Sequence, residues 1–600
     1  MANKPITKNK GTVNHRNIKQ QHPLKKKVSL TEKEKQNILY AIIGIFFLTL
    51  IAFWPSFKND FVGWDDEGYL HENLAFIGKI DIKKIFSNFV MANYHPLTIF
   101  LYAIEYHFVK LNPFLYHFTN VVLHLCNTLL VFWLGFKMSR KLGVAVIFSL
   151  LFAVHPLHVE SVSWISETKD VLYGFFFIFS MIFYLYYIDD KKKNKYYLIS
   201  FIFFVFSVLS KAMAVSLPLV LLLIDYLKEK QITKRMVIEK IPFFIISIIF
   251  GILAIIAQKH AEGLYNVSAY SSLDKLLFPF YAIMFYVYKM FVPANLAIIY
   301  PYPAKVGGVL PGIYYFAPIA FISLALITYF SLRKTKLLLY AVLFYLACII
   351  LVIQVLPVGM SLASDRYFYI SCLGFFYAGG EGFTYLYNKK LSGKISLKYI
   401  ITGIAALIIL SYSIATFQRA KVWTNSLTLW TDMIPKEPQI DKVYYGIGTY
   451  WYRIGDKQGV DDKARKEAKE KAKYFYKKTL ECNQSNEKAL NNLGNCYYNE
   501  AKYDSAFIYY SKLVQVNPKY TLGLHNLGNY YYAKLNMQKA IEYYNRVIDI
   551  DPNFSLTYYT LGLCYQALRD DNKANEYFIK GARLGEANSQ KILQSKNISY

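Results

Sequence analysis

Long apolar runs are the feature that most constrains the fold of this 600-residue chain. They recur from residue 38 to residue 417 and then stop. A helix needs roughly 20 mainly apolar residues to cross the hydrocarbon core of a bilayer. The runs therefore predict a helical membrane domain with several crossings. About eleven crossings are expected, at residues 38–57, 113–136, 142–157, 171–188, 196–211, 213–227, 241–257, 312–332, 337–356, 366–388 and 399–416.

Basic residues predict how this domain is oriented. The net charge of +28 is concentrated in residues 1–36 and in alternate connections between the apolar runs. Cytosolic loops of membrane proteins carry such an excess, so nucleic acid is not the expected partner. We expect residues 1–36 to be a disordered cytosolic tail of a multi-pass cell (inner) membrane protein. The basic connections are residues 137–141, 191–195, 228–240, 333–336 and 389–398.

Two further apolar stretches do not fit as crossings. Residues 96–109 are interrupted by Glu105 and His107, and residues 278–291 are followed by Pro293. Counting either stretch as a span would place the later basic connections outside. We therefore expect both to be interfacial or re-entrant segments at the outer rim. For 278–291 the sequence leaves a full crossing open.

A 34-residue period marks the polar C-terminal part. Gly494, Gly528 and Gly562, each preceded by Leu, lie 34 residues apart, and aromatic, Ala and Pro positions repeat with them. This period is typical of tetratricopeptide repeats, which stack pairs of helices and bind proteins or peptides. The predicted fold is thus all-α, a membrane helical bundle followed by an α-solenoid. Its parts are the tail at 1–36, the membrane domain at 37–420, a linker at 421–442, and about four repeats with a capping helix at 443–600.

Three adjacent carboxylates follow the first apolar run. Asp65, Asp66 and Glu67 come directly after Trp64, in a loop expected on the outer side. Three neighbouring side chains cannot all face one cavity, so one or two would act together. A carboxylate there can serve as a general base or hold a divalent cation through its oxygens. A hydrated loop without chemistry is the alternative, and the sequence leaves these readings open.

A second polar cluster links two apolar runs on the same side. His155, His158 and Glu160 are followed closely by Lys169 and Asp170. His158 and Lys169 can donate hydrogen bonds to a phosphate. Zinc is the rival ligand, but the histidines do not have the i, i+4 spacing of helical zinc pairs.

Polar residues also occur within or beside the apolar runs. Asn120 and His124 share one helical face, and Asp365-Arg366 lies where the tenth run begins. Polar groups at such depth are usually functional or paired with one another. The Arg366 guanidinium suits two phosphate oxygens, whereas an ion pair with Asp365 or a distant carboxylate is the alternative.

Together these motifs resemble the transmembrane and tetratricopeptide-repeat O-mannosyltransferases and their bacterial relatives, within the GT-C class of membrane glycosyltransferases. The resemblance covers nearly the whole chain after the N-terminal tail. Each motif is weak alone, but their order is specific. They are Trp64-Asp65-Asp66, His95-Pro96-Leu97, Asn112 to His124, His155 to Val162, Lys169-Asp170, Ala363 to Tyr367, and the terminal repeats.

The resemblance implies transfer of a mannose-like sugar from a polyprenyl phosphate, undecaprenyl or dolichyl, to a hydroxyl of an extracytosolic protein recruited by the repeats. Asp65 or Asp66 would be the base of an inverting displacement, and Arg366, Lys169 and His158 would hold the donor phosphate. Transfer to a lipid-linked glycan, or a membrane-anchored scaffold without enzymatic activity, are the alternatives. The supporting polar residues would be Glu67, His95, Asn120, His124, His155, Glu160, Asp170 and Asp365.

Overall fold

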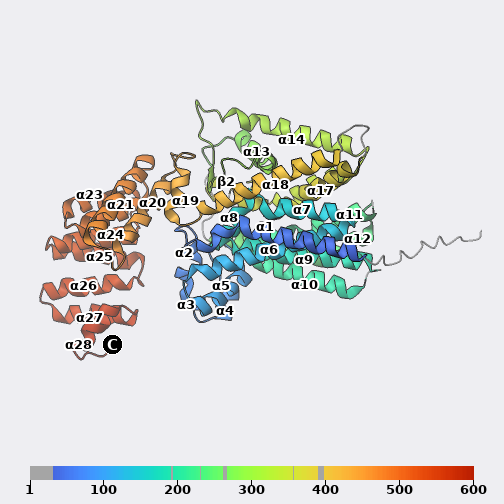
Figure 1. Cartoon of the computed structure of the whole chain (residues 1–600). Helices are drawn as coiled ribbons and strands as arrows, with labels where there is room; N and C mark the ends of the chain where they lie inside the picture. Colours follow the sequence, from blue (N-terminus) through green and yellow to red (C-terminus); the bar gives the residue numbers. More distant parts are fainter. Residues whose placement is uncertain are drawn as a thin grey trace, which may run out of the picture.

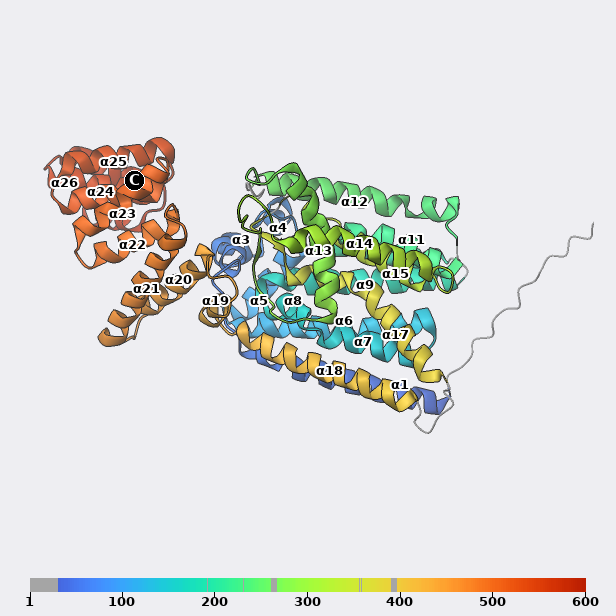
Figure 2. The same ribbon diagram turned by 90° about the horizontal axis from the view of Figure 1, so that it is seen from above.

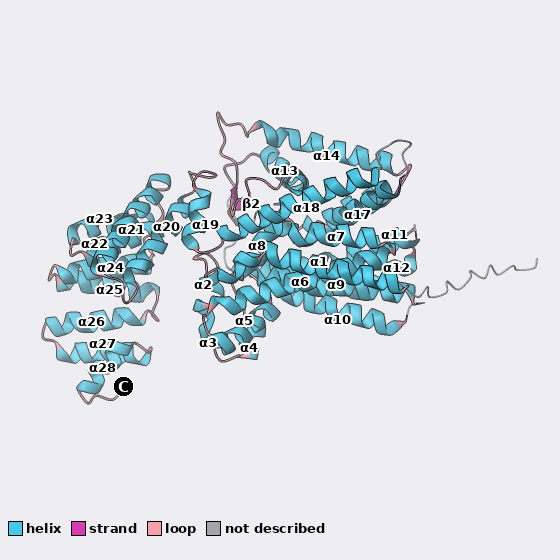
Figure 3. Cartoon of the chain, in the orientation of Figure 1, coloured by secondary structure: helices cyan, strands magenta, loops and turns pink. Residues whose placement is uncertain are grey.

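The computed structural model describes residues 31–190, 193–229, 231–260, 267–355, 357, 359–389 and 397–600. These residues are almost entirely helical (Figure 3). The prediction of an all-α bundle with a C-terminal repeat region is therefore confirmed. Most of the expected N-terminal tail and parts of three basic connections, 191–195, 228–240 and 389–398, lie outside the described residues.

Each of the eleven apolar runs forms a helix (Figure 1). Six of the described helices are long and apolar enough to cross a membrane, or seven if the bent pair of α7 and the segment after it is one span. The number of crossings thus stays a prediction. The helices are α1 (Glu32–Ala52), α6 (Pro113–Ser139), α7 (Leu142–Val154), α9 (Thr168–Asp189), α10 (Asn194–Ser210), α11 (Leu217–Glu229), α12 (Lys234–His260), α14 (Gly312–Ser331), α15 (Leu337–Ile349), α17 (Leu373–Asn388) and α18 (Leu397–Val422).

Helix α1 begins inside the segment expected to be disordered. The Thr31 side chain accepts a hydrogen bond from the Glu34 backbone, and the Glu34 carboxylate accepts one from the Thr31 backbone. This capping box satisfies backbone donors at the helix start, so the helix extends into the polar sequence. Residues 32–36, which were expected to belong to the disordered tail, are therefore helical.

Short elements gather at the end of the bundle nearest the repeats, whereas the start of α1 lies at the opposite end (Figures 1 and 2). Two apolar stretches expected at the rim form α5 and α13, and neither is among the helices that could cross a membrane. Whether they lie at an interface stays a prediction. The short elements and these two helices are η1 (Trp54–Lys58), α2 (Asp66–Tyr69), η2 (His71–Asn73), α3 (Leu74–Ile77), α4 (Ile82–Ser87), α5 (Pro96–Val109), η3 (Pro156–His158), α8 (Val159–Ser163), η4 (Ile165–Glu167), η5 (Ala212–Ser216), α13 (Ser272–Phe291), η6 (Asp365–Tyr367) and α16 (Phe368–Ser371), with the antiparallel strands β1 (Tyr300–Pro301) and β2 (Ser361–Ala363).

The C-terminal helices stack in pairs, as the 34-residue period predicts (Figure 1). A Cβ atom on Gly494, Gly528 or Gly562 would lie 2.4 Å from an aromatic ring carbon of the paired helix. Only glycine allows this approach, which explains its place in each repeat. The helices are α19 (Ser426–Met433), α20 (Asp441–Asp456), α21 (Asp462–Cys482), α22 (Glu487–Asn499), α23 (Tyr503–Val516), α24 (Thr521–Ala533), α25 (Met537–Ile550), α26 (Ser555–Ala567), α27 (Asp571–Arg583) and α28 (Ala587–Ser595).

Candidate active site

Breaks between helices bring the predicted polar residues together. The chain turns at Pro156 after α7, is extended at Trp164 between α8 and η4, and is extended again at Ser364 before η6. The side chains on these short turns meet α2 and the start of α9. The site therefore lies at the end of the bundle that faces the repeats (Figure 1).

Asp66 is a buried carboxylate whose oxygens accept several hydrogen bonds. Its side chain accepts a hydrogen bond from the Val62 backbone (2.8 Å) and one from the Ser166 backbone (3.0 Å), as well as one from the Ser166 hydroxyl. Burial raises the pKa of Asp66 to about 7, although these hydrogen bonds favour the charged form. Asp66 thus ties the loop after η1 to the turn before α9.

Asp65, its neighbour, faces a different environment. It is partly exposed at the N-terminus of α2 and does not cap that helix. Within the described part of the chain, its carboxylate has neither a hydrogen bond nor an ion pair. The structure therefore distinguishes two residues that the sequence could not. The Asp66 carboxylate is hydrogen-bonded to the protein, whereas the Asp65 carboxylate could contact a substrate.

Glu167 holds three cations close to this loop. Its carboxylate lies 3.0 Å from Lys169 Nζ, 3.2 Å from Lys211 Nζ and 3.3 Å from Arg366 Nε. The Glu167 side chain is 2 % exposed, so these interactions are screened little by water. The sequence marks Glu167 as a charged residue beside Lys169 and Lys211 as one at the end of an apolar run, but it predicts no specific role for either.

Arg366 is positioned by two acids, neither of which is Asp365. Its Nη1 atom lies 2.5 Å from Glu160 Oε1, and its backbone N–H donates to Glu160 Oε2 (3.3 Å). Its guanidinium lies 5.6 Å from the Trp164 ring centroid. Asp365 instead accepts a hydrogen bond from the Tyr300 hydroxyl (2.8 Å), so Arg366 forms its ion pairs with distant carboxylates and not with its neighbour.

Lys169 and Asp170 complete the cluster. Lys169 donates to the Tyr69 hydroxyl (3.2 Å) and to the Ser166 carbonyl (2.8 Å). Asp170 accepts from the Ser161 hydroxyl (3.0 Å) and pairs with Lys211. Both residues therefore belong to the predicted cluster, and Lys169 lies between Tyr69 of α2 and Glu167.

His158 lies in the core beside the cluster. Its Nδ1 atom is 2.8 Å from the Phe152 carbonyl oxygen, and its Nε2 atom is 3.6 Å from Cys372 Sγ. The side chain is fully buried and packs on aromatic rings. Both nitrogens thus face protein atoms, and we leave His158 out of the donor-phosphate site.

The remaining predicted polar residues mainly hold the fold around the site. Asn120 donates to the Trp164 carbonyl (3.1 Å) and fixes the break before η4. His124 Nδ1 lies 2.9 Å from the Tyr369 hydroxyl, and His155 Nε2 lies 3.0 Å from the Met290 carbonyl. They are supporting residues in this structure.

His95 and Glu67 lie at the edges of the site. His95 is buried with its ring 5.3 Å from that of Tyr69, and neither of its nitrogens has a hydrogen-bond partner among the described residues. Glu67 pairs with Arg453 of α20, so the acidic loop contacts a helix of the C-terminal part.

Four tryptophans connect the loop to that C-terminal part. Trp64 lies between Trp164 and Trp430, with ring centroids 5.2 and 5.3 Å away, and Trp164 stacks on Trp423 at 5.3 Å. The Gly63 backbone also donates to the Ser426 hydroxyl (2.7 Å). The row of rings joins segments that are far apart in the sequence, which is why the sequence did not predict it.

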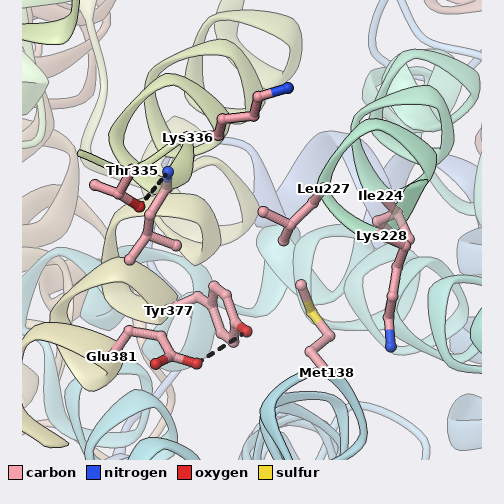
Figure 4. A pocket seen from close by; sticks show the side chains of 9 residues that line it. Met138, Ile224, Leu227, Lys228, Thr335, Lys336, Tyr377 and Glu381 are labelled. Atoms are coloured by element: carbon pink, nitrogen blue, oxygen red, sulfur yellow. Dashed lines mark hydrogen bonds between the residues drawn. The ribbon is translucent and has the colours of Figure 1, made fainter. Parts of the chain in front are cut away.

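Among the described residues, no group of three or more His, Cys, Asp or Glu side chains could hold a metal ion. The divalent-cation alternative therefore finds no set of ligands there. A separate pocket of about 310 Å³ is lined by residues of α6, α11, α15 and α17 and contains none of the predicted residues (Figure 4).

Two family models match the C-terminal part of the chain, and curated relatives match further stretches of it. Two tetratricopeptide-repeat models match residues 487–520 and 522–554. "Protein O-mannosyl-transferase F38B6.6" of Caenorhabditis elegans is 24 % identical over 442 residues, which are 70 % of this chain and 61 % of the relative. "Protein O-mannosyl-transferase TMTC1" of Homo sapiens is 30 % identical over 132 residues, covering 22 % of this chain and 13 % of the relative.

The "Crystal structure of MamA" is 20 % identical, covers 30 % of this chain and 96 % of that chain, and has a TM-score of 0.24. The chain spans less than two thirds of the length of the curated relatives named above. The resemblance is confirmed: this chain is similar to the protein O-mannosyl-transferases of the transmembrane and tetratricopeptide-repeat family, and its C-terminal part contains tetratricopeptide repeats.

Proposed function

We propose that this protein is a membrane glycosyltransferase of the GT-C type that moves a sugar from a polyprenyl phosphate to a hydroxyl of a protein. One observation carries the proposal. An unbonded carboxylate, Asp65, lies beside a cluster of positioned cations at the end of the membrane bundle that faces the repeats. Acceptor hydroxyl and lipid-linked donor would meet there. The O-mannosyl-transferases that resemble this chain support the same chemistry.

The reaction we infer is a direct displacement. The acceptor oxygen forms a bond to the anomeric carbon on the face opposite the phosphate, while the bond between that carbon and the phosphate oxygen breaks. The electron pair of the broken bond leaves with the phosphate. Asp65 takes the proton of the acceptor hydroxyl, as general bases do in such transfers. The configuration at the anomeric carbon inverts, and polyprenyl phosphate is the second product.

Asp65 rather than Asp66 fits the role of base. A base must reach the substrate proton, and Asp66 already accepts from Val62 and Ser166 in a buried position. Asp66 acts as a positioning residue for the loop that carries Asp65.

Arg366 and Lys169 are the proposed contacts of the leaving phosphate. Charge that develops in a reaction is best stabilised by groups that are already oriented. Glu160 and Glu167 orient Arg366, and Glu167 with Ser166 orients Lys169. Because these cations are fixed before the substrate binds, little reorganisation accompanies the step.

The repeats would recruit the protein acceptor. Tetratricopeptide repeats commonly bind proteins or peptides along their stacked helices. Here α20 contacts the loop of Asp65 through Glu67, so an acceptor held by the repeats would be close to the proposed base. This arrangement requires both parts on the outer side of a multi-pass membrane protein.

Labelled donor tests the proposal. The purified protein would be incubated with polyprenyl-phosphate sugars, undecaprenyl or dolichyl, in the presence of extracytosolic proteins and of lipid-linked glycan. We expect label in protein. Label in the glycan alone would support the second acceptor class, and no release of sugar from any donor would favour a scaffold without enzymatic activity.

A further inference from the structure

A lysine from the C-terminal part reaches into the candidate active site. Helix α20 begins at Asp441, and the Nζ atom of Lys442 lies 4.4 Å from the ring centroid of Trp64, the residue before Asp65. An ammonium group over an indole face is attracted by the ring's negative face. The sequence placed Lys442 in a linker and gave it no role.

Lys442 differs from the other cations of the site. Arg366, Lys169 and Lys211 each lie within 3.3 Å of a carboxylate oxygen. Within the described residues, the ammonium of Lys442 has no hydrogen bond and no ion pair. The positive charge of Lys442 is therefore not neutralised by a carboxylate in direct contact with it.

The absence of an ion pair at Lys442 matters because the other charges of the cluster balance one another. Glu160, Glu167 and Asp170 balance Arg366, Lys169 and Lys211, three against three. A polyprenyl-phosphate sugar is a phosphodiester and brings one negative charge. When the sugar leaves, the phosphate becomes a monoester and its charge grows towards −2, because its second pKa is about 6. A balanced cluster needs another cation to offset this charge.

The position of Lys442 is fixed by the packing of α20. One turn after Lys442, a Cβ atom on Gly446 would lie 2.4 Å from Trp430 Nε1, so the helix lies directly against this ring. Further along α20, Arg453 pairs with Glu67. Arg366 and Lys442 lie over Trp164 and Trp64, whose ring centroids are 5.2 Å apart.

We propose that Lys442 binds the phosphate of the lipid-linked donor together with Arg366 and stabilises the charge that builds on it as the sugar leaves. The proposal rests on the glycosyltransferase function proposed above. In this proposal the repeat domain contributes a residue to the donor site and also binds the acceptor protein. Displacement of α20 would then weaken donor binding even though the membrane bundle stays intact.

The ionisation of Lys442 gives the proposal a second readout. Burial lowers the pKa of Lys442 to about 8, against the opposing effect of the nearby Asp65 and Asp441, while Lys488 and Arg366 act in the same direction as burial. The free protein would therefore lose this positive charge as the pH rises through about 8. A phosphate monoester is already doubly charged in that range, so its own ionisation does not interfere.

The test is binding of farnesyl phosphate, a short prenyl phosphate, to the purified full chain, with farnesol as the ligand that lacks phosphate. We expect Lys442→Gln to weaken farnesyl phosphate binding roughly tenfold to hundredfold, the range for a lost hydrogen bond to a charged group, and to leave farnesol unchanged. Lys442→Arg should restore binding. The matched control is Lys488→Gln, which removes an exposed charge near Lys442 and should change little.

The pH profile separates binding from a purely structural role. Wild-type affinity for farnesyl phosphate should fall above pH 8, whereas that of Lys442→Arg should not, because arginine stays charged. Equal affinities for Lys442→Gln and Lys488→Gln would overturn the inference. If Arg366→Lys weakened binding and Lys442→Gln did not, the inference alone would fail. If the wild type bound farnesyl phosphate no better than farnesol, the proposed function would fail with it.

Discussion

At the scale of single residues, Asp65 and Asp66 show how adjacent carboxylates acquire different roles. Asp66 is 1 % exposed and accepts hydrogen bonds from two segments, whereas Asp65 is partly exposed and unbonded within the described residues. The Asp66 oxygens are already occupied by donors of the protein, whereas a partly exposed carboxylate such as Asp65 can reach the proton of a substrate. The difference arises from where the backbone directs each side chain.

The sequence predicted the cluster but not its pairing. Most predicted polar residues do converge, because a charged residue beside apolar runs needs a partner or a cavity. The partner of Asp66 is Ser166, which is 100 residues away, and the partners of Arg366 are Glu160 and Glu167. Such distant contacts leave no local pattern in a single sequence. For the same reason His158 could not be recognised as a core residue.

Arg366→Lys should weaken donor use. A lysine cannot contact both Glu160 and Glu167 with the planar geometry of a guanidinium, so the cation would be less well positioned for phosphate. We expect kcat/KM for the donor to fall roughly tenfold or more, the typical loss for a hydrogen bond to a charged group. The exposed Arg465→Lys is the control. Unchanged donor kinetics in a folded Arg366→Lys protein would contradict the assignment.

At the scale of elements, the repeats were the most predictable part of the chain. Their period comes from contacts within each helix pair, which are local, so glycine and aromatic residues recur at fixed spacing. The docking of α20 on the tryptophan row was not predictable, because Trp64, Trp164 and Trp430 lie in three separate segments. The observed ends of helices also differ from those predicted from the sequence, as the start of α1 shows.

Gly446→Ala should disturb this docking. The added Cβ atom would overlap Trp430 Nε1, since it would lie 2.4 Å from it. We expect a loss of about 1–3 kcal/mol, the usual range for overpacking. Thermal unfolding and cleavage by a protease in residues 434–440, between α19 and α20, would measure it.

The control for that experiment is Gly403→Ala in α18. Nothing lies within 4 Å of a Cβ atom at this position. Its expected effect is neutral or stabilising by up to about 1 kcal/mol, because alanine favours helix more than glycine does. Equal stability and equal cleavage of the two variants would show that α20 does not lie against Trp430.

At the scale of the whole molecule, the candidate site and the repeats lie at one end of the bundle, and the start of α1 lies at the other (Figure 1). The apolar runs predicted the bundle because a bilayer demands long helices. They could not predict how many helices cross, since several of the observed helices are short.

Cysteine labelling tests the orientation. In a background without the six native cysteines, Glu72→Cys places a thiol near the Asp65 loop and Arg140→Cys places one in the basic connection after α6. Both positions are exposed. A membrane-impermeant maleimide should label Glu72→Cys in intact cells and Arg140→Cys only after permeabilisation, because basic connections stay in the cytosol. The reverse pattern would place the proposed site on the wrong side.

The most direct test of the account compares transfer by Asp65→Asn and Asp66→Asn. With a labelled polyprenyl-phosphate sugar and a protein acceptor, Asp65→Asn should lower turnover by about 10²–10⁴ at unchanged stability, since only the base is lost. Asp66→Asn should mainly lower the free energy of unfolding, by about 1–3 kcal/mol, because its amide cannot accept all the hydrogen bonds of the carboxylate. Near-normal transfer by Asp65→Asn would contradict the account.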